Sequence, residues 1–537
     1  MSENTGAAVG VPDDAEVPAY SWYALGVLVL VYVLNFVDRQ ILSILANDIK
    51  ADLKVDDAFL GFLYGTAFAI FYALFGIPLG KLADSWHRVR LMTIGLALWS
   101  LMTAVSGFAK NGTMLTGARI GVGVGEATAG PSAYSLISDW FPARLRATAL
   151  AIYSSGLYIG GGVSLLIGGL IVEGWNEAYP GGGPLGLAGW QAAFIAVGLP
   201  GLLLAVWVLT LREPVRGAID GIPTPRDPAP FRGFFDELLQ IIPPFTLIGA
   251  LRRGVGALLL NILAAIGFAG AAVAMTALVP AGEGNFIRSV SDQWLFLGVG
   301  YYAVFSWACG QRARDLPSFR LTWGSPAFLM TILGYGMVSF VSYAASFFAA
   351  PYGEIAFSIP KTQIGWLVGA PAAVAGFLGV IAGGRLADWL FVRFAAGRLF
   401  VVLFGLSAPV PVIWITFTTQ SETVFYVCAA LGQFLAASAL GAAAATSQSL
   451  VLPRMRGVAT ATFFLATTLV GLALGPFLAG WVSASNGGDI SLGVRSTLWA
   501  VPVGLACLIA AIRLVPAASA SLLARAEAAG EGALKTA

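Results

Sequence analysis

Residues 80–90 read Gly-Lys-Leu-Ala-Asp-Ser-Trp-His-Arg-Val-Arg, and residues 384–393 read Gly-Arg-Leu-Ala-Asp-Trp-Leu-Phe-Val-Arg. The apolar stretches of the sequence include two groups of six, and each of these segments follows the second stretch of its group. The recurrence of Gly-basic-Leu-Ala-Asp at equivalent places predicts that the chain contains two related halves. Glycine permits a tight exit from one helix, and the aspartate can cap the N–H groups that begin the next. Two ordinary interfacial loops are the alternative interpretation.

The composition outside these two segments is that of a membrane protein. Of the 537 residues, 58% are hydrophobic and 11% are charged, and the mean hydropathy is +0.82. These values exclude a water-soluble globule. The 30 Lys and Arg residues nearly balance the 28 Asp and Glu residues, so no nucleic-acid-binding footprint is present. We expect the three cysteines, each alone in an apolar stretch, to fill the core. The single histidine is too few for a His-based metal site or catalytic dyad.

Apolar stretches divide the chain into six, two and six predicted spans, which gives an all-α polytopic protein with two extra helices inserted between two six-helix bundles. The spans are residues 23–45, 58–80, 91–109, 113–138, 147–172, 189–211, 254–281, 293–311, 324–350, 364–384, 397–418, 423–451, 457–481 and 496–516. The domains are a disordered N-terminus (1–20), the first bundle (21–212), a linker whose composition cannot build a core (213–253), the inserted pair (254–323), the second bundle (324–516) and a tail (517–537).

Most Lys and Arg residues fall on the side of the membrane that holds both termini. The positive-inside rule therefore predicts cytoplasmic termini in a plasma-membrane protein. The sequence starts without a basic n-region, so we expect no cleaved signal peptide. Twelve spans would preserve the same orientation if the inserted pair did not cross the bilayer.

Four charged residues fall well inside predicted spans: Asp38 and Arg39 in the first, and Arg119 and Glu126 in the fourth. A charge at the bilayer centre costs about 3 kcal/mol, so each is expected to find a partner or to face water. Arg119 and Glu126 are two helical turns apart on one face. One interpretation is a purely structural ion-pair lattice. In the other, Asp38 and Glu126 exchange a proton while Arg39 or Arg119 holds an anionic headgroup.

The second half lacks these charges. Aligning the halves through their loops places Ser342, Tyr343, Ala429 and Ala436 at the equivalent positions. We expect polar and aromatic cavity residues instead, namely Tyr335, Ser339, Tyr343 and Gln433, although ordinary interhelical packing is the alternative. A charged half facing a neutral half suits an amphiphile. Glycines at packing spacing in the fifth span can also form a bending gate between the bundles: Gly156, Gly160, Gly161, Gly162, Gly168 and Gly169.

The paired Gly-x-Leu-x-Asp loops resemble the signature of the major facilitator superfamily. Within it, residues 35–39 (Asn-Phe-Val-Asp-Arg), 119–127 and 130–142 are similar to the Spinster family. The resemblance implies two bundles around a central cavity, alternating access by rocking, and proton-coupled movement of lysolipids or sphingosine phosphate. It also implies a gating role for the loop residues Gly80, Asp84, Arg88, Gly384 and Asp388. The inserted helix pair departs from the plain twelve-span pattern.

These observations predict a proton-coupled secondary transporter of an anionic lysophospholipid or sphingosine-phosphate-like lipid. We expect a monomer in contact with membrane lipids, with no cofactor other than the coupling proton. A broader exporter of drugs or organic anions is the alternative within transport. A membrane-embedded enzyme is disfavoured because the spans lack a histidine and a nucleophile-base arrangement.

Overall fold

The computed structural model describes residues 17–220, 227–278 and 285–531, and these residues form helices and no strands. The predicted all-α class is therefore confirmed. Most of the predicted N-terminal disorder lies outside the described residues, and the first helix already begins at Ala19. The first bundle comprises α1 (Ala19–Ile44), α2 (Ala46–Leu53), α3 (Asp57–Tyr64), α4 (Thr66–Ser85), α5 (Arg88–Ser106), α6 (Gly112–Glu126), α7 (Ala129–Trp140), α8 (Ala143–Ala178) and α9 (Gly189–Leu209).

The second bundle repeats this arrangement with more interruptions. Two of its spans contain π-helical turns, which widen the helix by one residue and interrupt the regular hydrogen-bond pattern. Its elements are α15 (Pro326–Phe357), α16 (Lys361–Ile364), the π-turn η3 (Gly365–Gly369), α17 (Ala370–Arg393), α18 (Gly397–Ser407), α19 (Pro409–Thr416), α20 (Glu422–Ala437), α21 (Ala439–Ser449), α22 (Arg456–Ala466), the π-turn η5 (Thr467–Leu472), α23 (Gly475–Ser485), α24 (Ile490–Ser496) and α25 (Val501–Ala520).

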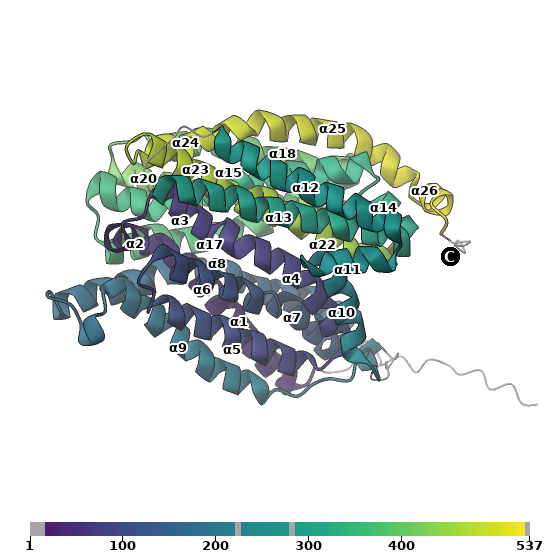
Figure 1. Ribbon diagram of the computed structural model, residues 1–537, viewed down its shortest axis with the longest axis horizontal. Helices are drawn as coiled ribbons and strands as arrows, with labels where there is room; N and C mark the ends of the chain where they lie inside the picture. The colour runs from purple at the N-terminus through teal and green to yellow at the C-terminus, as the bar shows by residue number, and fades with distance from the viewer. Residues whose placement is uncertain (1–16, 221–226, 279–284, 532–537) are drawn as a thin grey trace, which may run out of the picture.

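Helices occupy all fourteen predicted stretches, and twelve of the described helices are long and apolar enough to cross a membrane. The two that do not reach that standard are the α6–α7 pair and α13 (Asn285–Arg314). The α6–α7 pair carries Arg119 and Glu126, and α13 carries polar residues at both ends. Figure 1 shows the first bundle in purple and blue below the second bundle in green and yellow.

The linker is more ordered than its composition predicts, so that prediction was wrong for residues 230–252. They form α10 (Pro230–Ile241) and α11 (Phe245–Arg252), which meet at an angle of 101°. In Figure 1, α10 runs crosswise to the spanning helices. The physical reason is amphipathicity: Ile241 is buried, and the Phe231 ring lies 5.3 Å from Trp86 of the first bundle. A short polar segment can thus fold against an existing core.

Both described ends of the chain lie at the end of the molecule that carries the linker, here called the linker end. Near its start, α1 contacts the end of α9, where the Arg212 amide donates to the Tyr20 hydroxyl. The tail forms α26 (Leu522–Ala528), and Arg320 of α14 (Leu316–Leu321) donates to the Ala528 carbonyl. An arrangement with both ends on one side agrees with an even number of crossings.

The two bundles touch closely at the opposite end. The buried Lys361 of α16 contacts Asp48 of α2 at 3.2 Å and Glu354 of α15 at 2.5 Å. Ser483 of α23 donates to the Asp57 carboxylate of α3 at 2.7 Å. These contacts hold the bundles together at the end opposite the linker.

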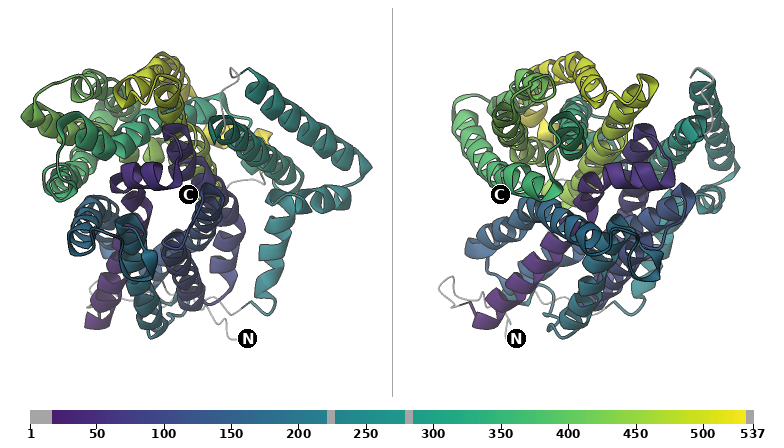
Figure 2. Two further views of the ribbon diagram at one scale, coloured as in Figure 1. Left: turned by 60° about the vertical axis from the view of Figure 1, so that its left-hand side comes forward. Right: turned by 90° about the vertical axis from the view of Figure 1, so that its left-hand side faces the viewer.

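The inserted pair stands beside the bundles. In the most apolar stretch of helix α12 (Val255–Ala277), only 11% of the residues are buried. Its side chains therefore face outward along most of its length. Figure 2 shows α12 in teal at the outer edge of the molecule. Helix α13 lies between α12 and the bundles, where Phe296 packs on Phe62 of α3 and Phe71 of α4.

Candidate functional site

The four intramembrane charges come together on facing sides of α1 and α6. Their residues are buried, with exposed fractions of 0% for Asp38, 6% for Arg39, 0% for Arg119 and 1% for Glu126. Arg39 Nη2 donates to Glu126 Oε2 at 2.7 Å. The side chain of Asn111 caps the start of α6 and so helps to fix where its charges lie along α1. The predicted polar wall is present in the structure.

Much of this cluster has no hydrogen-bond partner. Arg119 Nη1 donates to the backbone carbonyl of Asp38 at 3.0 Å, not to its carboxylate. Both carboxylate oxygens of Asp38, Oε1 of Glu126, and Nε and Nη2 of Arg119 are buried and have no hydrogen-bond partner among the residues that the structure describes. Burying ionisable atoms in this way is costly, because lost hydration is not replaced. A group that can gain or lose a proton removes part of that cost.

Aromatic rings surround the Arg39 guanidinium. Its central carbon lies 4.7 Å from the ring centroid of Phe36, 4.4 Å from Phe68 and 5.1 Å from Tyr72. Cation–π attraction of this kind is stronger where water is excluded. Sequence reasoning missed this cage, because Phe68 and Tyr72 belong to α4 and only the proximity of Phe36 to Arg39 is visible along the chain.

A cavity of about 260 Å³ lies between the bundles, lined by residues of both. Arg39 lines it, whereas Asp38, Arg119 and Glu126 are not among its lining residues. In this conformation one of the two predicted headgroup arginines therefore faces the cavity, and the other lies behind it. Glu126 does not line the cavity, but it forms an ion pair with Arg39, which does.

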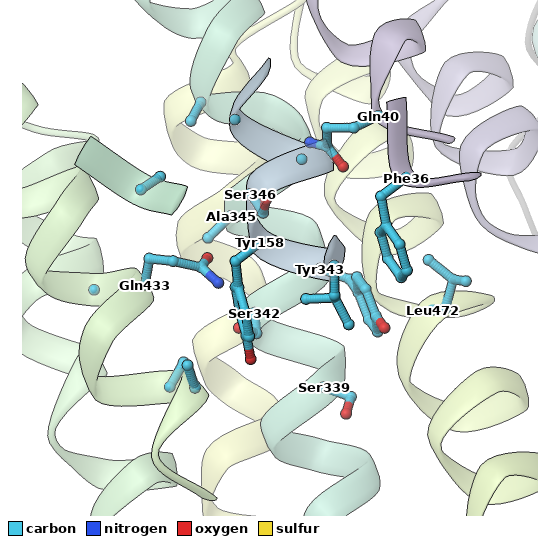
Figure 3. Close-up of a pocket in the computed structure, with 18 of the residues that line it drawn as sticks. Phe36, Gln40, Tyr158, Ser339, Ser342, Tyr343, Ala345, Ser346, Gln433 and Leu472 are labelled. Atoms are coloured by element: carbon cyan, nitrogen blue, oxygen red, sulfur yellow. The ribbon is translucent and has the colours of Figure 1, made fainter. Parts of the chain in front are cut away.

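The second bundle contributes the neutral wall that its sequence predicts. Tyr335, Ser339, Tyr343 and Gln433 all line the cavity, and so do the repeat-equivalent residues Ser342, Ala429 and Ala436. Figure 3 shows Ser339, Ser342 and Tyr343 on one helix, with Gln433 across from them. Tyr335 also stacks on Phe463 at 5.1 Å, so packing and cavity lining are combined in one residue.

Several lining residues were not expected. Cys428 lines the cavity from α20, so its interpretation as a core-filling thiol was wrong. Tyr64, Tyr158 and two threonines of η5 also line it. A hydroxyl or thiol in an apolar helix has the same sequence pattern whether it faces a neighbour or a cavity, so only the rotation of each helix distinguishes them.

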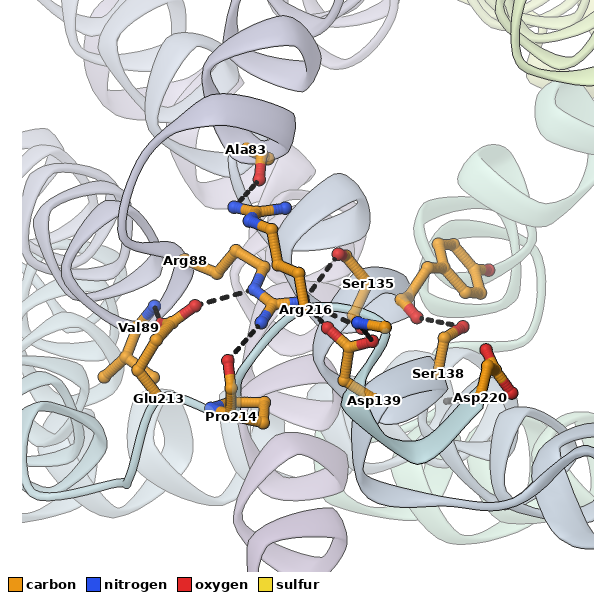
Figure 4. A network of polar contacts seen from close by, with 12 residues as sticks. Ala83, Arg88, Val89, Ser135, Ser138, Asp139, Glu213, Pro214, Arg216 and Asp220 are labelled. Carbon is orange, nitrogen blue, oxygen red and sulfur yellow. Dashed lines mark hydrogen bonds and ion pairs between the residues drawn. The ribbon is translucent and has the colours of Figure 1, made fainter. Parts of the chain in front are cut away.

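The loop residues of the two halves have different surroundings. Arg88 is fully buried; its Nε donates to Glu213 at 2.7 Å and its Nη1 to Asp139 and Ser135. Figure 4 shows this network. In the second half, Asp388 is largely exposed and lies 3.5 Å from Arg398. The linker residue Glu213 therefore completes the cluster around Arg88 in the first half.

The predicted local role of the loop glycines and aspartates was wrong. Gly80 and Asp84 lie inside α4, which continues to Ser85, and Gly384 and Asp388 lie inside α17. Asp84 therefore does not cap the next helix. The start of α5 is capped instead by His87, and Glu213 accepts a hydrogen bond from the Val89 amide at 2.9 Å. A contact from the distant linker replaced the local cap.

Comparison with known proteins identifies the family. Residues 28–353 match the Major Facilitator Superfamily domain, which covers more than half of the chain. The chain belongs to the major facilitator superfamily. Members of this superfamily are transporters, so this multi-pass membrane protein is a transporter and not an enzyme.

The individual relatives of this superfamily member include an efflux pump and Spinster proteins. An MFS-type efflux pump of Mycolicibacterium smegmatis is 28% identical over 504 residues, which are 94% of this chain and 92% of that protein. Protein spinster of Drosophila melanogaster is 27% identical over 219 residues, 40% of this chain and 34% of that protein. The crystal structure of a bacterial homolog to the human lysosomal transporter Spinster, inward-facing and unoccupied, aligns with a TM-score of 0.65 at 25% identity over 95% of this chain and 99% of that one.

Proposed function

We propose that this chain is a proton-coupled secondary transporter that moves an anionic amphiphile, such as a lysophospholipid or a sphingosine-phosphate-like lipid, by alternating access. The observation that carries the proposal is the position of Arg39. It is the one cation among the cavity-lining residues of the described chain, and its carboxylate partner Glu126 lies behind the wall. The proposal also assigns the linker end to the cytoplasm of a plasma-membrane protein that works as a monomer.

Arg39 binds the headgroup in this mechanism. A guanidinium offers a planar fork of donors that fits a phosphate or carboxylate. The aromatic rings around Arg39 keep the side chain in place while its partner changes. Arg119 is the second predicted headgroup ligand. It reaches the anion only in a conformation that exposes it, since here it bonds to the Asp38 carbonyl.

The proton is coupled to the substrate by competition for Arg39. When Glu126 is ionised it occupies Arg39, and when it takes up a proton it leaves that guanidinium for the substrate anion. Asp38 is the second proton acceptor, because its carboxylate is buried and has no ion-pair partner among the described residues. Each exchange leaves the net charge of the cluster nearly constant, which keeps its desolvation cost low.

The apolar part of the amphiphile lies against the second bundle. Among the described residues, its cavity wall carries alanines, glycines, serines and aromatic rings and no charged residue. Alternating access requires the contacts at the end opposite the linker to open while the linker end closes. The Lys361–Asp48 pair and the glycine contacts between α8 and η3 are the contacts that part in this motion.

Transport by the purified chain in proteoliposomes tests the proposal. Uptake of a labelled lysophospholipid is expected to depend on an imposed pH gradient, and Glu126→Gln or Asp38→Asn is expected to abolish that dependence. The matched control is Glu177→Gln, an exposed acid at the far end of α8. Gradient-independent uptake that these two changes leave unaltered would contradict proton coupling.

The headgroup assignment has its own test. Arg39→Gln is expected to lower affinity for a lysophospholipid by about tenfold or more, since a hydrogen bond to a charged group contributes about 1.5–3 kcal/mol. The uncharged monoacylglycerol of the same chain length is expected to lose much less. Arg119→Ala is likewise expected to lower affinity for the lysophospholipid more than affinity for the monoacylglycerol. Equal losses for both ligands would refute a headgroup role.

A broader exporter of drugs or organic anions is the second candidate. The full-length similarity to an MFS-type efflux pump favours it. The cavity arginine disfavours cationic substrates, so a carrier of anionic amphiphiles is not expected to transport them. Transport of structurally unrelated organic cations at rates equal to those of the lysophospholipid would therefore select the broader exporter.

A further inference from the structure

The π-turn η5 lies at the junction of the cavity, the first bundle and the inserted helix α13. Within it, the Ala473 amide donates to the Thr468 carbonyl at 2.8 Å, one residue further back than in an α-helix. This shift frees the Leu469 carbonyl from its usual helical donor. Thr467 and Thr468 of the same turn line the cavity.

Helix α13 supplies hydrogen-bond donors to the outer side of this turn. The Tyr301 hydroxyl donates to the freed Leu469 carbonyl at 3.5 Å. The buried Gln293 amide donates to the Ala473 carbonyl at 3.2 Å, which also accepts from Thr66 of α4 at 2.7 Å. Helix α13 is therefore anchored to Leu469, inside η5, and to Ala473, the residue that directly follows η5.

Hydrophobic contacts fill the rest of this seam between the bundles. Ala303 and Trp307 of α13 share one buried cluster with Ile70 of α4 and with Leu465 and Leu469 at the end of α22 and in η5. Trp294 packs on Phe477 of α23 at 6.1 Å. Figure 1 shows α13 between α12 and the span formed by α3 and α4. The inserted helix thus contacts both halves of the transporter on the outer side of the cavity wall.

We propose that Tyr301 and Gln293 of α13 are positioning residues that hold η5 in its π-helical register, so that Thr467 and Thr468 face the transport cavity. A π-turn is less stable than an α-helix unless its displaced carbonyls find other donors. If these donors are lost, the turn relaxes toward the α-helical register, which rotates one flank by about 100° relative to the other. The threonines then turn away from the cavity. The inserted pair thereby shapes the substrate site without touching the substrate.

Thiol labelling tests this positioning without any assumption about the substrate. Thr468→Cys is placed in a full-length chain whose Cys309, Cys428 and Cys507 are replaced by serine, and its rate of reaction with a water-soluble maleimide is measured in proteoliposomes. Adding Tyr301→Phe and Gln293→Leu is expected to slow labelling by about fivefold, the change expected for loss of a buried hydrogen bond. Tyr301→Phe alone removes one hydroxyl and is expected to give a smaller change in the same direction.

Two controls separate positioning from general damage. Val273→Ala changes a 69% exposed residue of α12 in the same inserted pair and is expected to leave labelling unchanged. In a chain that keeps only the native Cys428, which lines the same cavity from α20, the double change is expected to leave the rate unchanged. Labelling rates of Thr468→Cys that differ by less than about twofold with and without the double change would overturn the proposal. Equal slowing of labelling at Cys428 would overturn it as well. The labelling rates can be measured even if the chain does not transport lysophospholipid, so the failure of the proposed function and the failure of this proposal are distinguishable.

Discussion

A methyl group added at Gly162 is expected to shift the transporter away from the conformation described here. Gly162 of α8 meets Gly369 of η3 in the seam between the bundles. A Cβ at position 162 would lie 2.3 Å from the Gly369 carbonyl oxygen and 2.7 Å from the Ala373 Cβ. Both neighbours belong to the other bundle, so the bundles must separate locally. Overpacking costs about 1–3 kcal/mol, and a cost confined to one conformation corresponds to a roughly 5- to 150-fold change in the conformational equilibrium.

Distances between spin labels at the end opposite the linker measure this shift. Labels at the exposed positions Ala51 and Glu422, in a chain without native cysteines, report the separation of the bundles there. Gly162→Ala is expected to increase the population with the longer distance. Gly161→Ala is the matched control, because a Cβ at position 161 meets nothing within 4 Å. Identical distance distributions for the two variants would refute the reasoning.

Two further predictions concern charges at the two ends. Arg88→Gln is expected to lower the free energy of unfolding by about 3 kcal/mol, because Asp139 and Glu213 lose the buried cation between them; thermal unfolding beside the exposed control Arg90→Gln measures this, and equal midpoints would contradict it. At the other end, burial raises the pKa of Asp48, an effect that Lys361 opposes. Asp48 therefore binds a proton more tightly in the conformation described here than in one that exposes its carboxylate. The resulting stabilisation is complete below about pH 4 and is lost as pH rises through the raised pKa. The spin-label distances should depend on pH accordingly; Asp48→Asn should remove that dependence, and an unchanged pH profile would count against it.

The sequence predicted the two-bundle fold because its signals are local. Hydropathy shows where the helices lie, and the repeated Gly-basic-Leu-Ala-Asp segments relate the halves. It was less successful where a distant segment replaced a local contact. Asp84 was expected to cap α5, yet Glu213 of the linker bonds to the start of that helix. Residues 230–252 were expected to lack a core, yet they fold onto α4 and α13.

The candidate site shows the same division. The sequence by itself determined that Asp38, Arg39, Arg119 and Glu126 form one polar cluster, because the cost of a charge in a bilayer is a property of each residue and its span. Only the tertiary structure decided that Arg39 faces the cavity while the other three lie behind it. That choice depends on the rotation of each helix about its axis, which packing against other helices sets. The aromatic rings around Arg39 and the support of η5 by α13 arise in the same way, from residues that are distant in sequence and adjacent only after folding.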